Sequence, residues 1–189
     1  MNKIVFLLEE ASMKSLLEEF LPRAFPDTTF VLIAHEGKDD LEKSIPRKLR
    51  AWREPGVRFV VLRDKDQNDC ISLKQRLLQM CKEGGRPDTL VRIVCSELES
   101  WFLGDPDALA QAFGNEQLRN IGRRAQFRNP DSVQQPSDAL ERLVPEFQKV
   151  SGARRMANLL SRERNTSTSF QVLLSGLDRI LSESCAEPR

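Results

Sequence analysis

Short apolar runs alternate with helical patterns along the first half of the chain. Four runs rich in β-branched and aromatic residues, at residues 4–8, 30–33, 59–62 and 90–95, predict strands, and the first of them is expected to be buried on both faces. Between them, apolar residues recur every three or four positions, which is typical of helices packed on a core. This alternation favours an α/β fold, in which one mainly parallel sheet of about four strands carries helices on both faces.

Two prolines mark expected interruptions of the helical segments. The first helix, which begins near Met13, is expected to stop at Pro22. The second, over residues 39–52, is expected to break or restart at Pro46. A third helix follows the third strand, and two short helices follow the fourth.

The pattern changes after residue 114. Residues 115–136 are polar and rich in arginine, which predicts a long loop, and helical spacing then resumes. We therefore expect a single domain over residues 1–189, with an α/β core at 1–114 and a helical extension at 137–189 packed on the sheet. The strongest apolar stripe belongs to this extension: Phe170, Leu173, Leu174, Leu177, Ile180 and Leu181.

Composition excludes several classes of protein. The 29 lysines and arginines balance 28 acids, so net charge indicates neither a nucleic-acid nor a membrane partner. The longest apolar run is too short to cross a bilayer, and no secretory pattern opens the chain. Four cysteines without a CxxC pair and one histidine argue against structural zinc, and they predict reduced thiols in a cytoplasmic protein. The cysteines are Cys70, Cys81, Cys95 and Cys185.

Acidic residues follow every predicted strand. They are Glu9 and Glu10 after the first strand, Glu36 after the second, Asp64 and Asp66 after the third, and Glu97 and Glu99 after the fourth. The carboxyl ends of parallel strands meet at one edge of a sheet, so these side chains are expected to share a crevice. Crowded carboxylates repel one another, and a hard divalent cation such as Mg²⁺ relieves that repulsion.

The Asp-x-Asp pair after the third strand suggests how such an ion could be held. In an extended segment, residues i and i+2 point the same way, so Asp64 and Asp66 are expected to face one ion. An EF-hand loop is rejected: Asp69 stands where glycine is needed, and Gln75 where the bidentate glutamate belongs.

These residues resemble the Toprim superfamily, whose members carry a glutamate after the first strand and Asp-x-Asp after the third. Glu9, Asp64 and Asp66 match that order. The chain is most similar to a family of bacterial Toprim-like proteins described as domain-of-unknown-function family 4276. The stretches that carry the resemblance are LLEEASMKSLL, HEGKDDLEKSIPRKLRAW, FVVLRDKDQNDC and VRIVCSELESWFLGD, with weaker similarity through RNTSTSF.

The resemblance implies a Toprim-like, Rossmann-like fold and a Mg²⁺-dependent nuclease, with Mn²⁺ as a substitute ion. Glu9, Asp64 and Asp66 would hold the ion, and Glu97 or Glu99 would complete a second site or orient water. Toprim glutamates are usually followed by glycine, whereas Glu10 stands there, so either glutamate is a candidate ligand. The resemblance also implies a nucleic-acid substrate and an ATPase as the kind of partner to expect; the sequence indicates no oligomeric state.

Other polar residues have two interpretations each. His35 could serve as a general base or simply finish the second strand, with Glu36 as a neighbouring candidate ligand. Lys38 could stabilise phosphate charge or lie on a solvated turn. Two basic groups could track a phosphate backbone or form solvated faces. They are Arg47, Lys48 and Arg50 in the second helix, and Arg119, Arg123, Arg124 and Arg128 in the predicted loop.

Alternative functions stay open. The sequence contains no tyrosine, which excludes a tyrosine nucleophile of the topoisomerase kind within this chain. A receiver-like signalling domain would use Glu9, Glu10, Asp64 and Ser96, but it needs a fifth strand ending in lysine, which the pattern lacks. A non-catalytic subunit, in which the acids bind metal or dock a partner, is the other alternative.

Overall fold

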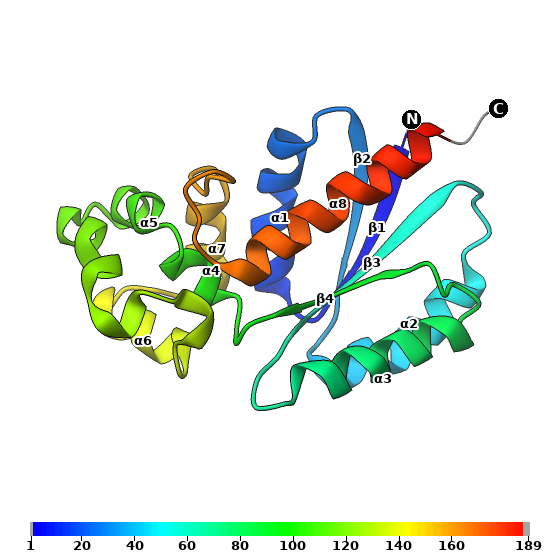
Figure 1. Ribbon diagram of the computed structural model, residues 1–189, viewed down its shortest axis with the longest axis horizontal. Coiled ribbons are helices and arrows are strands. Elements are labelled where there is room, and N and C mark those ends of the chain that lie inside the picture. The colour runs from blue at the N-terminus through cyan, green and yellow to red at the C-terminus, as the bar shows by residue number, and fades with distance from the viewer. Residues whose placement is uncertain (1, 187–189) are drawn as a thin grey trace.

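The protein forms an α/β fold around a parallel sheet (Figure 1). The computed structural model describes the backbone of residues 2–186 and the side chains of residues 3–183. The strands are β1 (Asn2–Leu8), β2 (Thr28–Ala34), β3 (Val57–Asp64) and β4 (Leu90–Val94). The helices are α1 (Ala11–Ala24), α2 (Lys38–Ala51), α3 (Cys70–Glu83), α4 (Glu99–Leu103), α5 (Pro106–Phe113), α6 (Pro136–Leu143), α7 (Lys149–Ala157) and α8 (Thr168–Ala186).

The strand order is β2-β1-β3-β4, and all three pairings are parallel. The chain therefore crosses over from β2 to β3, so β1 and β3 become neighbours although β2 separates them in sequence. Leu8 pairs with Leu62 near the end of β1, and Asp64 pairs with Val94 at the end of β4. This adjacency is what a shared acidic crevice after the first and third strands requires, and that part of the prediction is confirmed.

Each face of the sheet has its own apolar core. Phe6 and Leu62 belong to the core that α1 and α8 cover, and Leu7 and Val61 to the core that α2 and α3 cover. Figure 1 shows these two helix pairs on opposite sides of the sheet. Coverage on both faces explains why the strands are continuous apolar runs without polar alternation.

The two prolines lie inside helices, where the sequence led us to expect interruptions. α1 continues past Pro22 to Ala24, and α2 runs through Pro46. Proline removes one backbone hydrogen bond from a helix. In α2, Ile45 and Leu49 lie on either side of Pro46 and are buried against the sheet. This burial of apolar surface holds the helix together across the missing bond.

The segment predicted as a loop is largely helical. It contains three 3₁₀ helices, η1 (Glu116–Arg123), η2 (Ala125–Phe127) and η3 (Pro130–Ser132). Leu118, Ile121 and Phe127 are buried and anchor it to the core. The i, i+3 spacing of Leu118 and Ile121 is the signal of a 3₁₀ helix, but polar residues and arginines obscured it.

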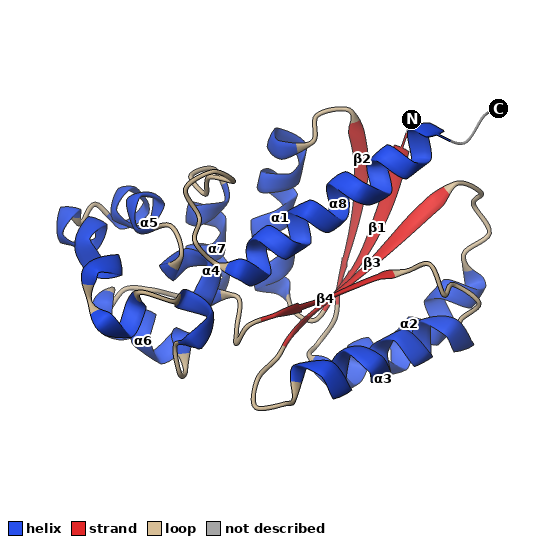
Figure 2. Ribbon diagram, in the orientation of Figure 1, coloured by secondary structure: helices blue, strands red, loops and turns tan. Residues whose placement is uncertain are grey.

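The C-terminal helices divide between two locations. α8 packs against the sheet and α1, as predicted for the helical extension. α6 instead packs on α4, and α7 lies along α1 and contacts α5. Figure 2 shows α4, α5, α6 and α7 grouped beyond the carboxyl ends of the strands. This helical group therefore stands next to the edge where the acidic residues gather.

None of the helices that the structure describes is long and apolar enough to cross a membrane.

The thiols of Cys70, Cys81 and Cys95 are free, and burial raises the pKa of both Cys81 and Cys95 to about 11. Cys185 lies outside the side chains described.

Replacement of Phe170 by alanine tests the contribution of α8. The Phe170 ring is fully buried, 5.3 Å from the ring of Phe20 and 5.1 Å from that of Trp101 between centroids. Phe170→Ala is expected to lower the free energy of unfolding by about 3–5 kcal/mol in urea titration, because it leaves a cavity. Val172→Ala on the exposed side of α8 is the control and should cost about 0.5 kcal/mol or less. Equal losses would show that α8 is not a core helix.

Candidate functional site

The ends of β1 and β3 bring two carboxylic acid residues into direct contact. The backbone N–H of Asp64 donates a hydrogen bond of 3.0 Å to Oε2 of Glu9. Both residues are buried, with relative exposures of 9% for Glu9 and 5% for Asp64. The contact follows from the strand order, since Glu9 comes directly after β1 and Asp64 ends β3.

Burial and mutual repulsion disfavour the charged forms of these acids. Burial raises the pKa of Glu9, and the Asp64 N–H bond only partly offsets this. The pKa of Asp64 lies well above its ordinary value, first because of burial and then because of the charges of Glu9, Glu10, Glu99 and Asp66. These acids are thus within electrostatic range of Asp64, and they form what we call the acidic edge: Glu9, Glu10, Asp64, Asp66 and Glu99.

Glu99, the first residue of α4, is fully buried. Neither of its carboxylate oxygens, nor Oδ1 of Asp64, accepts a hydrogen bond from any residue that the structure describes. Burial raises the pKa of Glu99, and the charge of Lys149 partly counters that rise. Buried carboxylate oxygens without partners are costly, so they indicate a place for a cation or for donors outside the chain.

Lys149, at the start of α7, is a basic residue whose charge acts on Asp64 and Glu99. Burial lowers its pKa, but the charges of Glu99, Glu10, Glu97 and Asp64 outweigh that effect and raise it overall. The packing of α7 along α1 brings this lysine to the acidic edge. Sequence reasoning missed Lys149 because it lies far along the chain from every strand end.

Arg63 approaches from the α2 side of the sheet. Its side chain is buried, with Nη1 3.1 Å from Oε1 of Glu42 and Nε 3.8 Å from Oε2 of Glu9. Nη2 lies 4.0 Å from Oδ2 of Asp66. The pairing is ionic and loose, since Nε and Nη1 reach no described acceptor in hydrogen-bond geometry. An arginine inside an apolar strand signals buried carboxylates, and the sequence offered this signal in FVVLRD.

Asp66 does not extend β3. Its φ of 51° is left-handed, and the backbone N–H of Asn68 donates to the carbonyl of Lys65 at 3.0 Å, which closes a turn. The extended segment that the prediction assumed therefore ends before Asp66, and a shared orientation of the Asp64 and Asp66 carboxylates stays a prediction. Asp66 is half-exposed and lies toward Arg63.

Glu97 and Glu10 hydrogen-bond to serines. Oε2 of Glu97 accepts from the backbone N–H of Ser137 at 2.9 Å and from its hydroxyl at 2.6 Å. Glu97 thereby caps the start of α6, whereas the Glu99 oxygens have no described donor. The Ser12 hydroxyl donates to Oε1 of Glu10 at the start of α1. Between Glu97 and Glu99, the structure favours Glu99 as the carboxylate available to a ligand.

His35 is a buried structural residue in this arrangement. Its Nδ1 lies 2.8 Å from the carbonyl of Leu8, and its Nε2 lies 2.6 Å from the hydroxyl of Ser44. A carbonyl can only accept, so Nδ1 donates to Leu8, while Nε2 shares a hydrogen bond with the Ser44 hydroxyl. Both nitrogens are thus engaged, which matches the interpretation of His35 as a residue that finishes the strand.

Glu36 and Lys38 are outside the buried part of the edge, beyond the end of β2. The backbone N–H of Glu36 donates to Oδ2 of Asp40. Lys38 lines a hollow of about 440 Å³ beside the acidic edge. The residues lining this hollow, called the edge hollow below, are Lys38, Asp66, Gln67, Asn68, Ser96, Glu97, Gln134 and Gln135.

The basic residues of α2 lie away from this edge. α2 begins at Lys38 beside the edge hollow and packs on the parallel sheet, so Arg47, Lys48 and Arg50 lie in its far half. At 1.5 Å per residue, Arg50 is about 18 Å along the helix axis from Lys38. Its guanidinium donates to the carbonyl of Glu83 at the end of α3.

The acidic edge has the donor chemistry of a metal centre but not a preformed ligand set. Within the described residues, no group of three or more His, Cys, Asp or Glu side chains is placed so that it could hold a metal ion. The donors suit a hard cation, since the unpartnered oxygens of Asp64 and Glu99 are carboxylate oxygens. Glu9 and Asp66 are drawn toward Arg63, and they would have to turn to join such a set.

The raised pKa values make stability depend on pH. Asp64, Glu9 and Glu99 bind protons more tightly in the folded chain, so the free energy of unfolding should fall as pH rises above their ordinary values of 3.8 and 4.5. Asp64→Asn should flatten that fall in metal-free buffer and, at neutral pH, stabilise the protein by about 1–3 kcal/mol.

Urea titrations across pH in the presence of a chelator check this expectation. Asp27→Asn, an isosteric change at an exposed aspartate, is the control and should leave the pH profile unchanged. If the pH profile of Asp64→Asn were identical to that of the original protein, ionisation of Asp64 would not destabilise the folded state.

Comparisons with known proteins place the chain in a family. The C-terminal region of the Burkholderia pseudomallei OLD protein has a similar structure, with a TM-score of 0.58 and 16% identity over 91% of this chain and 95% of that chain. This likeness confirms the predicted Toprim-like fold. Curated proteins gave no match. The family model described as "Domain of unknown function (DUF4276)" matches residues 8–178, most of the sequence, and the chain therefore belongs to this family.

Proposed function

We propose that this protein cleaves phosphodiester bonds in nucleic acid with the help of Mg²⁺ or Mn²⁺. The observation that carries the proposal is that Asp64 and Glu99 are buried carboxylates with unpartnered oxygens, and that Asp64 contacts Glu9 at the ends of neighbouring strands. Burial and repulsion make these acids costly without a counter-ion, and a divalent cation supplies one. The Toprim-like fold agrees with this chemistry.

Asp64 and Glu99 are the proposed primary ligands, and Glu9 and Asp66 would complete the set by turning away from Arg63. A divalent ion held there would polarise a phosphoryl oxygen and lower the pKa of a bound water. Glu9 is preferred to Glu10, because it lies against Asp64 while Glu10 accepts from Ser12. Glu97 is assigned to holding α6 in place.

Two basic residues have supporting roles. Arg63 holds Glu9 and Asp66 from the α2 side, so it keeps these carboxylates near the edge when no cation is bound. Lys149, whose charge acts on Glu99, adds a positive charge near the edge, where it can interact with a phosphate. Water is the proposed nucleophile, and the chain contains no tyrosine that could attack in its place.

A non-catalytic, partner-docking subunit is the second candidate function. It is favoured by the absence of a preformed three-ligand group among the described residues. A receiver-like domain has less support, because the described sheet has four strands and the fifth, lysine-bearing strand of receivers is missing from it. The ATPase partner is proposed on the Toprim resemblance alone.

Metal binding is tested by thermal denaturation. Mn²⁺ or Mg²⁺ should raise the melting temperature of the original protein, because a ligand that binds the native state stabilises it. The double substitution Asp64→Asn with Asp66→Asn should remove that rise. Asp69→Asn is the matched control, since Asp69 caps α3 through Ser72 outside the acidic edge and asparagine preserves the cap. An undiminished rise in the double variant would contradict the ligand assignment.

Cleavage is tested with labelled DNA and RNA, alone and with a candidate ATPase. We expect cutting only with Mg²⁺ or Mn²⁺, and a rate lowered by about 10²-fold or more in Asp64→Asn or Glu99→Gln, because each removes a ligand charge. Asp69→Asn should cut at the original rate. Full metal binding without cleavage of any nucleic acid would favour the docking subunit.

A further inference from the structure

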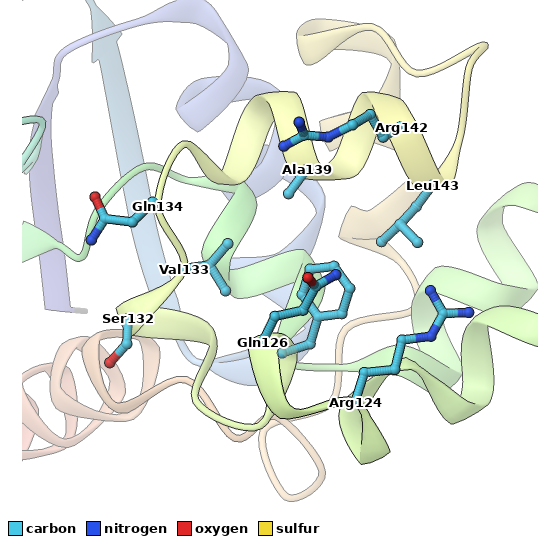
Figure 3. Close-up of a pocket in the computed structure, with 9 residues that line it drawn as sticks. Arg124, Gln126, Ser132, Val133, Gln134, Ala139, Arg142 and Leu143 are labelled. Carbon is cyan, nitrogen blue, oxygen red and sulfur yellow. The ribbon is translucent and has the colours of Figure 1, made fainter.

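A second cavity opens between the 3₁₀ segment and α6 (Figure 3). Its volume is about 690 Å³, which is in the range of about 300–1,000 Å³ typical of ligand pockets. In Figure 3, Arg142 lies on α6 on one side, Arg124 on the other, and Gln126 between them. The lining residues, called the arginine cavity below, are Arg124, Gln126, Phe127, Ser132, Val133, Gln134, Ala139, Arg142 and Leu143.

The chemistry of the lining suits an anionic ligand with an apolar body. Arg124 and Arg142 are exposed, and within the described residues neither guanidinium has a hydrogen bond or an ion pair. The residues that line this cavity include no carboxylate. Phe127, Val133 and Ala139 are buried and form an apolar floor, and the amides of Gln126 and Gln134 offer donors and acceptors above it.

The arginine cavity adjoins the edge hollow. Gln134 lines both, so the two hollows adjoin at this residue. The next residue, Gln135, has a left-handed φ of 49°, and it turns the chain into α6. Glu97 holds the start of α6 through Ser137. The turn between the two hollows and the helix that carries Arg142 are thus anchored by Glu97, which also lines the edge hollow.

We propose that the arginine cavity binds a nucleotide of the nucleic-acid strand that flanks the cleavage position. This inference rests on the proposed function and identifies how the substrate is held. Guanidinium groups bind phosphates in a bidentate manner, and amides read base edges. An apolar floor accommodates a sugar or base. The strand would run from the acidic edge through the edge hollow, past Gln134, to Arg124 and Arg142.

The basic residues of α2 are a poorer substrate contact. Arg47, Lys48 and Arg50 lie along the far half of α2, and the Arg50 guanidinium is engaged by Glu83. A strand centred on the acidic edge reaches the arginine cavity directly across Gln134.

The proposal is tested by the binding of labelled single-stranded DNA and RNA oligonucleotides, followed by fluorescence anisotropy in EDTA so that no cleavage occurs. Arg124→Gln with Arg142→Gln should weaken binding about tenfold or more. It should also reduce the slope of log K against log salt by about 1.4, since each phosphate of a single strand that an arginine neutralises contributes about 0.7 to that slope.

The matched control is Arg123→Gln with Arg128→Gln. It removes the same charge from exposed arginines of the same segment that do not line the cavity. Its affinity should stay within about twofold of the original, because exposed charges outside the contact act only through screened, long-range attraction. Melting curves confirm that both variants fold, as exposed positions predict.

Several outcomes would overturn the proposal. Equal weakening in both double variants would show diffuse charge attraction without a subsite, and unchanged affinity in Arg124→Gln with Arg142→Gln would show that the cavity holds no nucleic acid. Mononucleotides binding as tightly as oligonucleotides would make it a small-molecule site. Failure of the proposed function can be told apart from failure of this proposal. If Arg124→Gln with Arg142→Gln weakens oligonucleotide binding but the original protein shows no metal-dependent cleavage, the nucleotide site stands and the nuclease activity is rejected.

Discussion

The contact between Glu9 and Asp64 at the ends of β1 and β3 is the constraint on which this structure depends. It exists because the chain crosses over β1 on its way from β2 to β3, so that two acids distant in sequence meet at one sheet edge. Burial of Glu9 and Asp64 carries an electrostatic cost, which a single buried arginine from the opposite face offsets only loosely. A site in which negative charge exceeds its local compensation is suited to binding a cation.

The helical group beyond the sheet is an extension of this edge. Glu97 anchors α6, Glu99 begins α4, and α7 brings Lys149 to the same carboxylates. Residues 99–157 therefore do more than cover the core: they complete the charge arrangement of the acidic edge and build the adjoining arginine cavity. Open α/β sheets bind ligands beyond the carboxyl ends of their strands, and here that region is extended by a helical wall.

The sequence predicted what depends on local pattern. Continuous apolar runs predicted the four strands, of which β2 is only partly buried, and the acids after β1 and β3 pointed to the place where Glu9 and Asp64 meet. Arg63 was missed because its carboxylates, Glu9 and Glu42, come from other elements, although an arginine within a strand run is a readable signal. Lys149 was missed because its position depends on helix packing. The turn at Asp66 was missed because a left-handed aspartate has no strong signature without a following glycine.

The position of α8 has a consequence for how the chain is made. This helix closes the sheet face that Phe6 and Leu62 share with α1, and its Phe170 packs on Trp101, while Ser169 accepts from the indole N–H at 2.9 Å. On the ribosome, N-terminal segments emerge and fold first. The part of this sheet face that α1 does not cover thus remains open to water until α8 has emerged. For this protein, the hazard of aggregation is concentrated in the interval before α8 has emerged and packed.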